Sequence, residues 1–205
     1  MRLYRTCMVI LLVATFLSIV NAQDSHVNSV YVEKDKRTVI STDQMYVVNE
    51  PNQFIQMTLS FRYSGKQMTK VPDKVGISIW SLTKEPLYRK DTDRKLYMVA
   101  SGERFESSPT TYLVLKGETF KGQDTFFSEN RPGLGLQISL PQNAQVKSGG
   151  VNGLFMEQLY TDIKSKDLVR IVDAKDVEVF LGKQKLNLSE SQMNTLREFA
   201  RRLNP

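Results

Sequence analysis

The chain is nearly free of cysteine, histidine and tryptophan, and these shortages exclude several kinds of function. Its 205 residues include one of each: Cys7, His26 and Trp80. Structural and catalytic zinc sites need clusters of Cys, His and carboxylate ligands, and one cysteine and one histidine cannot supply such a cluster. His26 falls near the predicted start of the folded chain, where a frayed segment cannot hold a general base against a substrate. We therefore expect no metal, no cofactor, and no Ser–His or Cys–His catalysis.

The first 22 residues have the pattern of a secretory signal peptide. Two arginines precede an apolar run from Met8 to Val20, and Val20-Asn21-Ala22 places small residues at a cleavage site. The run is shorter than the roughly 20 residues of a membrane span, although an uncleaved anchor is the alternative. Cys7 would leave with the leader. We expect a secreted or periplasmic protein with a cysteine-free mature chain and no transmembrane segment after cleavage.

Charge of one sign is also scarce. The chain has 28 basic and 22 acidic residues, a net charge of +6, and the two signs alternate in runs such as Lys34-Asp35-Lys36-Arg37. A nucleic-acid-binding domain usually concentrates basic residues on one patch. The charge pattern therefore indicates a solvated surface, with no nucleic-acid partner.

Most of the chain before residue 150 predicts short antiparallel strands. In Ile55–Tyr63, apolar side chains alternate with polar ones, which is typical of a sheet with one face buried and one face wet. We expect strands at 31–33, 38–40, 45–48, 55–63, 75–82, 96–100, 111–115 and 134–140. The alternation of strands and helices that builds a parallel sheet is absent. The sequence therefore predicts a mainly β (α+β) fold, an antiparallel β-sandwich or an open barrel.

The last fifty residues predict a strand, a short helix, a hairpin and a closing helix. Ser189-Glu190-Ser191-Gln192 fits a capping box, and apolar residues follow at helical spacing. Gly182-Lys183 fits a type II′ turn between two alternating strands. The expected elements are a strand at 155–163, a helix at 166–173 capped by Ser165, the hairpin at 177–188 and the final helix.

We expect one β-rich domain over residues 23–205. The glycine-rich stretch Ser148–Gly153 could instead join a β-sandwich at 28–147 to a C-terminal α+β unit at 154–205. One domain is favoured, because fifty residues alone bury little core.

Three patterns suggest chemistry, and each also has a structural interpretation. Ser81-Leu82-Thr83-Lys84 matches the S-x-x-K motif of penicillin-binding enzymes, but here it ends a strand and the partner motifs are missing. Asp91-Thr92-Asp93 could offer oxygens to Ca²⁺, although basic residues flank it. Five acids near turns could include the pair that a glycosidase needs: Glu103, Glu106, Glu118, Asp124 and Glu129.

Aromatic residues suggest a binding face for a glycan or a peptide. The candidates are Trp80, Tyr88 and Tyr97, with Tyr112, Phe126 and Phe127 as further possible members of the same face. Trp80 alternates out of phase with Ile77 and Ile79, so it should lie on the opposite face of its strand. A second core layer would explain Trp80 equally well.

Four short runs in the C-terminal quarter carry a resemblance: Asp167–Ile171, Val177–Gly182, Leu188-Ser189 and Leu196–Ala200. They resemble the ends of uncharacterised exported bacterial β-rich proteins. The resemblance implies a bacterial envelope origin and no catalytic residues. We therefore predict a non-enzymatic binding or assembly module of the bacterial envelope, whose partner is another envelope protein or a glycan. The alternatives are a hydrolase acting on envelope glycans through Asp and Glu alone, and pairing of a sheet edge with a partner strand.

Overall fold

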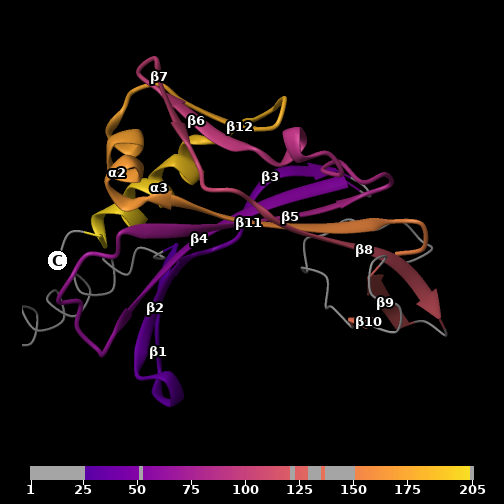
Figure 1. The fold of residues 1–205 in the computed structure, drawn as a ribbon, viewed down its shortest axis with the longest axis horizontal. Helices are drawn as coiled ribbons and strands as arrows, with labels where there is room; N and C mark the ends of the chain where they lie inside the picture. Colours follow the sequence, from indigo (N-terminus) through magenta and orange to yellow (C-terminus); the bar gives the residue numbers. More distant parts are fainter. Residues whose placement is uncertain (1–25, 51–52, 121–122, 129–134, 137–150, 204–205) are drawn as a thin grey trace, which may run out of the picture.

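The structure is a computed structural model that describes residues 26–50, 53–120, 123–128, 135–136 and 151–203. These residues form two antiparallel sheets and two α-helices (Figure 1). The larger sheet contains β1 (Val27–Val32), β2 (Arg37–Thr42), β3 (Met45–Glu50), β4 (Gln53–Ser64), β5 (Lys74–Thr83), β8 (Thr111–Phe120), β9 (Gln123–Ser128), β10 (Gly135–Leu136) and β11 (Phe155–Lys164). The smaller sheet contains β6 (Leu96–Ala100), β7 (Glu103–Glu106), β12 (Val177–Leu181) and β13 (Gln184–Leu186).

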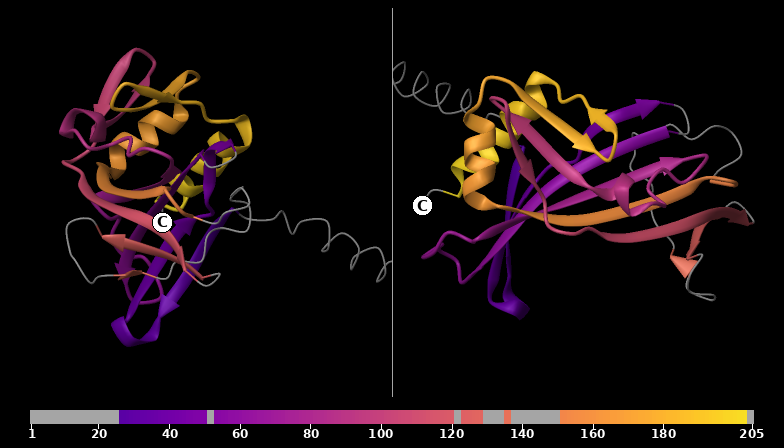
Figure 2. Two further views of the ribbon diagram at one scale, coloured as in Figure 1. Left: turned by 90° about the vertical axis from the view of Figure 1, so that its right-hand side faces the viewer. Right: turned by 45° about the horizontal axis from the view of Figure 1, so that its top comes forward.

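The strand order places β11 at the centre of the larger sheet although it comes late in the sequence. The order is β1-β2-β4-β5-β11-β8-β9-β10, with β3 also paired to β4, and the smaller sheet runs β13-β12-β6-β7. The smaller sheet and the helices α2 (Ser165–Asp173) and α3 (Glu190–Arg201) lie on the same side of the long strands (Figure 2). The predicted mainly β, antiparallel fold is confirmed, in a layered arrangement that is not a closed barrel.

The alternation in β4 explains which face of the larger sheet is covered. Ile55, Met57, Leu59 and Phe61 are all buried on one face, where they belong to the main hydrophobic core. The same core contains Leu168 of α2 and residues of α3, including Phe199, whose ring meets Phe61 edge-on at 5.3 Å. Each helix therefore hides its apolar face against the sheet.

The closing helix begins as its sequence predicts. The Ser189 hydroxyl accepts from the Gln192 backbone N–H, and the Gln192 side chain accepts from the Ser189 N–H. The predicted cap of the preceding helix was wrong. Ser165 is the first residue of α2, not its cap, and its hydroxyl donates to the carbonyl of Pro72. That bond ties the start of α2 to the segment before β5, a long-range contact that local sequence does not reveal.

In the two hairpins of the smaller sheet, the backbone conformation of each turn agrees with the residues in it. Ser101 and Gly102 both have positive φ, as a type I′ turn between β6 and β7 requires. Gly182 has φ of +59° while Lys183 does not have a positive φ, which agrees with the predicted II′ turn.

Some expectations differ or fall outside the described residues. Strands β7 and β9 were not predicted, because four to six residues with mixed polarity carry little periodic signal. Of the strand expected at 134–140, the structure describes only β10, and of the expected linker only residues 151–153, which form a turn. Among the described residues, no helix is long and apolar enough to cross a membrane.

Candidate functional site

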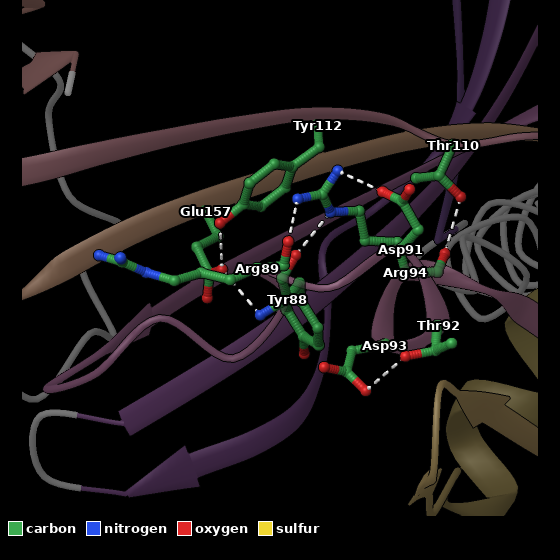
Figure 3. A network of polar contacts seen from close by, with 9 residues as sticks. All are labelled: Tyr88, Arg89, Asp91, Thr92, Asp93, Arg94, Thr110, Tyr112 and Glu157. Carbon is green, nitrogen blue, oxygen red and sulfur yellow. Dashed lines mark hydrogen bonds and ion pairs between the residues drawn. The ribbon is translucent and has the colours of Figure 1, made fainter. Parts of the chain in front are cut away.

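A single buried carboxylate organises the loop between β5 and β6. Glu157 of β11 has no exposed surface and faces the same side of the sheet as the main core. It accepts a hydrogen bond from the backbone N–H of Leu87 at 2.7 Å. It also accepts from the backbone N–H of Tyr88 at 2.9 Å and from the Tyr112 hydroxyl at 2.7 Å (Figure 3). The Ser81 hydroxyl adds a longer bond of 3.3 Å. Glu157 therefore fixes the chain at Leu87 and Tyr88, where the loop has no strand partner.

Arg94 fixes the second half of the same loop. Its guanidinium donates to the carbonyls of Tyr88 and Arg89 and to the Asp91 carboxylate, and it lies 3.8 Å from the centre of the Tyr112 ring (Figure 3). The guanidinium is planar, so its hydrogen bonds and its stacking on the Tyr112 ring together fix one orientation of the Arg94 side chain. The loop is thus held to the sheet at both ends by interactions that converge on Tyr112.

The loop also connects to the segment that follows β7. The Thr110 hydroxyl donates to the Arg94 carbonyl at 2.7 Å. Between the two segments lies an open groove of about 570 Å³, which we call the loop groove. It is lined by Asp91, Arg94, Lys95, Leu96, Tyr97, Arg104, Glu106, Ser107, Ser108, Pro109 and Thr110.

A stack of planar side chains runs from this groove across the outer face of the smaller sheet. The Tyr97 ring lies parallel to the Phe180 ring, with centres 4.8 Å apart, and the Arg104 guanidinium lies 3.8 Å from the Tyr97 ring centre. Arg104 is also paired with Glu106 at 2.9 Å. Stacking leaves the edges of a guanidinium available for hydrogen bonds, so this surface can offer both an apolar ring and fixed donors to a ligand.

The structure does not bring the three predicted binding aromatics together. Tyr97 lines the loop groove, whereas Tyr88 is 2 % exposed and its ring belongs to the main core. Trp80 lies on the opposite face of the larger sheet, as its phase predicts, where it is half-buried beside a second apolar cluster. Tyr112 is part of the Glu157 network, and the side chains of Phe126 and Phe127 are outside the described part of the structure.

The carboxylates considered for catalysis are dispersed. Glu106 and Asp91 line the loop groove, but their side chains are 68 % and 95 % exposed and each is paired with an arginine. Glu103 pairs with Arg170 on α2. Glu118 is exposed on β8, the Asp124 side chain and Glu129 fall outside the described part, and no described cluster of His, Cys, Asp and Glu could hold a metal ion.

The S-x-x-K serine is also explained by the Glu157 network. Ser81 is completely buried in β5 and donates to Glu157, whereas Lys84 is exposed beyond the end of the strand. A serine nucleophile must reach a substrate, and Ser81 lies under the loop instead.

Sequence reasoning missed Glu157, although a signal for it was present. In Phe155–Lys164, Glu157 alternates in phase with Leu159 and Ile163, so a charged residue stands on the buried face of a central strand. A charge in such a position requires several hydrogen-bond donors nearby. The partners could not be read from the sequence, because Leu87 and Tyr88 are about seventy residues away.

The phenol of Tyr88 predicts a stability change at alkaline pH. Its oxygen is buried with no hydrogen-bond partner in the described structure, and burial, with the nearby Glu157 charge, raises its pKa well above the ordinary 10.0. Above pH 10 the unfolded chain therefore loses a proton that the folded chain keeps, and stability falls by about 1.4 kcal/mol per pH unit from this group.

We expect Tyr88→Phe to remove this part of the alkaline loss. Urea unfolding at pH 9 and pH 11 should show wild type losing about 1–2 kcal/mol more than the variant, since the other tyrosines titrate in both proteins. At pH 7 the variant should be as stable as wild type, because the hydroxyl makes no bond that is lost. Equal losses of unfolding free energy in both proteins would contradict the assignment of this alkaline loss to the Tyr88 phenol.

The comparisons with known proteins add no functional information. The chain matches no protein-family model, no curated protein and no solved structure. The function is therefore inferred from the geometry of the loop groove and of the hydrogen-bond network around Glu157.

Proposed function

We propose that this chain is an exported, non-enzymatic binding module of the bacterial cell envelope that holds a segment of a partner protein in the loop groove. The observation that supports this best is the buried Glu157 carboxylate. Glu157 accepts four hydrogen bonds, of which two hold the backbone of a loop rich in charged residues and two come from Ser81 and Tyr112 of the sheet, so that one wall of an open groove is preorganised. Preorganisation is what a binding loop needs, because it lowers the entropy lost on association.

The composition of the groove favours a protein partner. Tyr and Arg are the residues most enriched at energetically dominant positions of protein interfaces, and Tyr97, Arg94 and Arg104 all line this groove. Ser107, Ser108 and Thr110 add hydroxyl groups at its edge, as in the polar rim of an interface. The proposed partner therefore contributes an extended segment that packs on Tyr97 and accepts from the guanidinium of Arg104.

Export is supported by the N-terminal sequence alone. The predicted signal peptide at residues 1–22 lies outside the described residues. An exported module would meet its partner in the periplasm or outside the cell, where a cysteine-free domain does not depend on disulfide formation.

The alternative of a glycan hydrolase has less support. It requires two carboxyl groups facing each other across one cleft, and Asp91 and Glu106 are the acids that line the loop groove. Both are open to water and each is paired with an arginine on its own side of the groove. Hydrolases of this kind carry out their chemistry where water is largely excluded.

Replacing Tyr97 with alanine should abolish most of the binding to the partner. A photo-crosslinking amino acid placed at Pro109, in protein expressed with its leader in the source bacterium, should give one discrete cross-linked protein. With Tyr97→Ala or Arg104→Ala added, its yield should fall steeply, since truncating a central aromatic or arginine costs about 2 kcal/mol or more, roughly thirtyfold in affinity.

The matched control is the same crosslinker at Lys34, which is exposed in η1 (Glu33–Asp35) between β1 and β2. Lys34 does not line the loop groove, and the β1–β2 hairpin extends away from the smaller sheet (Figure 1). A product of the same mass from Lys34, or an unchanged product with Tyr97→Ala, would place the interface elsewhere. Release of sugars from envelope glycans by the purified protein, abolished in Glu106→Gln, would favour the hydrolase instead.

A further inference from the structure

A second groove lies on the opposite face of the larger sheet, and we call it the sheet groove. It has a volume of about 740 Å³ and is formed by β1, β2, β4, β5, β11 and the segment before β5. Its lining residues are Val32, Arg37, Val39, Ser60, Phe61, Arg62, Pro72, Asp73, Lys74, Gly76, Tyr160 and Asp162. It shares no lining residue with the loop groove. Within β11, Tyr160 points away from the face that carries Glu157, because the two residues are an odd number apart.

The sheet groove contains an aromatic ring that is held against the sheet and still open to solvent. Tyr160 is 44 % exposed, which makes it one of the three large apolar or aromatic side chains most exposed in the described structure. Its phenol lies over Gly76 of the neighbouring strand, where any Cβ would meet the Tyr160 hydroxyl oxygen at 2.5 Å and ring carbons at 3.1 Å. Glycine at position 76 therefore admits the ring close to the backbone.

The Asp162 carboxylate lies close to the Tyr160 phenol. Burial, together with the negative charge of Asp162 two residues along the same strand, raises the pKa of the Tyr160 phenol, and Asp162 also pairs with Lys74 at 3.8 Å. Packing on Gly76 alone would be explained by a structural role, in which an aromatic side chain covers a glycine in a sheet. That role does not require the outer face of the ring to remain open in a groove, nor the charge that stands beside it.

That charge is the guanidinium of Arg62. Arg62 is exposed on β4 and makes no ion pair with another described residue, whereas Arg37 and Lys74 in the same groove pair with Asp35 and Asp162. Arg62 lies near enough to Tyr160 to act on the phenol electrostatically. The sheet groove therefore combines an open ring face with the unpaired cation of Arg62. Its lining also includes Asp73, an acid that makes no ion pair with a described residue, and Ser60, Asp162 and Lys74 supply further polar groups.

We propose that the sheet groove binds an acidic glycan, with a sugar ring stacked on Tyr160 and the sugar carboxylate bound by Arg62. The C–H groups on one face of a pyranose pack on an aromatic ring, and the ring hydroxyls can bond to Asp162, Lys74 and Ser60. A guanidinium binds a carboxylate through two parallel hydrogen bonds. This site goes beyond the proposed function, because it uses another face of the molecule and another class of ligand.

The test is calorimetric titration of the folded protein with three probes. These are trigalacturonic acid, its methyl ester, which keeps the rings and removes the charges, and triglutamate, which keeps the carboxylates and removes the rings. Trigalacturonic acid should bind, with the methyl ester and triglutamate each about tenfold weaker or more. No binding of trigalacturonic acid at millimolar concentration, or equal binding of triglutamate, would overturn the proposal.

Variants assign the binding to these residues. Tyr160→Leu, which still covers Gly76, should lose about tenfold in affinity, whereas Tyr160→Phe should stay close to wild type. Arg62→Gln should bind the acid and its methyl ester equally. Tyr97→Ala, in the loop groove, should leave glycan binding unchanged. Wild-type affinity in Tyr160→Leu would mean that Tyr160 only covers Gly76.

Discussion

Replacing Glu157 with alanine is expected to lower the free energy of unfolding by about 3–5 kcal/mol, a large part of the stability of a domain of this size. The variant removes the acceptor of two backbone N–H groups, at Leu87 and Tyr88, and of the Tyr112 hydroxyl. Buried donors left without partners cost about 1–3 kcal/mol each, and part of this is recovered because a desolvated charge is removed.

Glu157→Gln should fall between wild type and Glu157→Ala. It preserves the shape of the side chain, but its amide nitrogen cannot accept from an N–H group, so one or two of the bonds are lost. Urea unfolding measures all three proteins. In hydrogen exchange, Leu87 and Tyr88 should lose protection before the rest of the sheet, since their bonds to Glu157 hold the loop.

The matched control for this prediction is Glu178→Ala. Glu178 is also a strand glutamate, but it is ion-paired with Lys185 on the outer face of the smaller sheet, where such pairs contribute about 0.2–1 kcal/mol. If Glu157→Ala were no more destabilising than Glu178→Ala, the loop would be held by other contacts, and the preorganisation argued for the loop groove would lose its basis.

The elements with strong local signals were predictable from the sequence. The alternation in 55–63, the capping box at Ser189 and the glycine turn at Gly182 each depend on residues within one element, and the structure confirms them. The central position of β11 was not predictable, since its pairing with β5 and β8 joins segments far apart in sequence.

The candidate site was less predictable for the same reason. The exposure of an aromatic residue depends on what the fold places over it, so Tyr88 and Tyr97, nine residues apart, end in the core and in a groove respectively. Tyr160 was not predicted as a surface aromatic residue, because the apolar pattern of its strand is typical of a central strand. Its open position depends on Gly76, which meets it only across a strand pair.

Replacing Gly182 with alanine is expected to be the most damaging change at a glycine with positive φ, at about 2–4 kcal/mol. Gly182 has φ of +59°, which costs a residue with a side chain about 1 kcal/mol. In addition, a Cβ at this position would meet the Asp93 Cα at 2.7 Å and the Asp93 carbonyl oxygen at 2.8 Å. Those are backbone atoms, which cannot move aside as a flexible side chain can, and such overpacking adds about 1–3 kcal/mol.

Gly65→Ala separates the two contributions. Gly65 has φ of +80° with no atom within 4 Å of a built Cβ, so its alanine variant should cost about 1 kcal/mol from backbone strain alone. The difference between the two variants in urea unfolding measures the overlap with Asp93.

The Gly182 variant also tests how the smaller sheet supports the loop groove. The Gly182 N–H donates to the Lys95 carbonyl at 2.8 Å. The turn between β12 and β13 therefore contacts η2 (Asp91–Arg94) and the residue after it directly. Displacing this turn should shift the NMR signals of Lys95 and Arg94, which line the loop groove, while Gly65→Ala leaves them in place. Equal destabilisation by the two variants, with unchanged Lys95 signals, would show that η2 can move aside without a cost in stability. In that case the hydrogen bonds to Glu157 alone would position the wall of the loop groove.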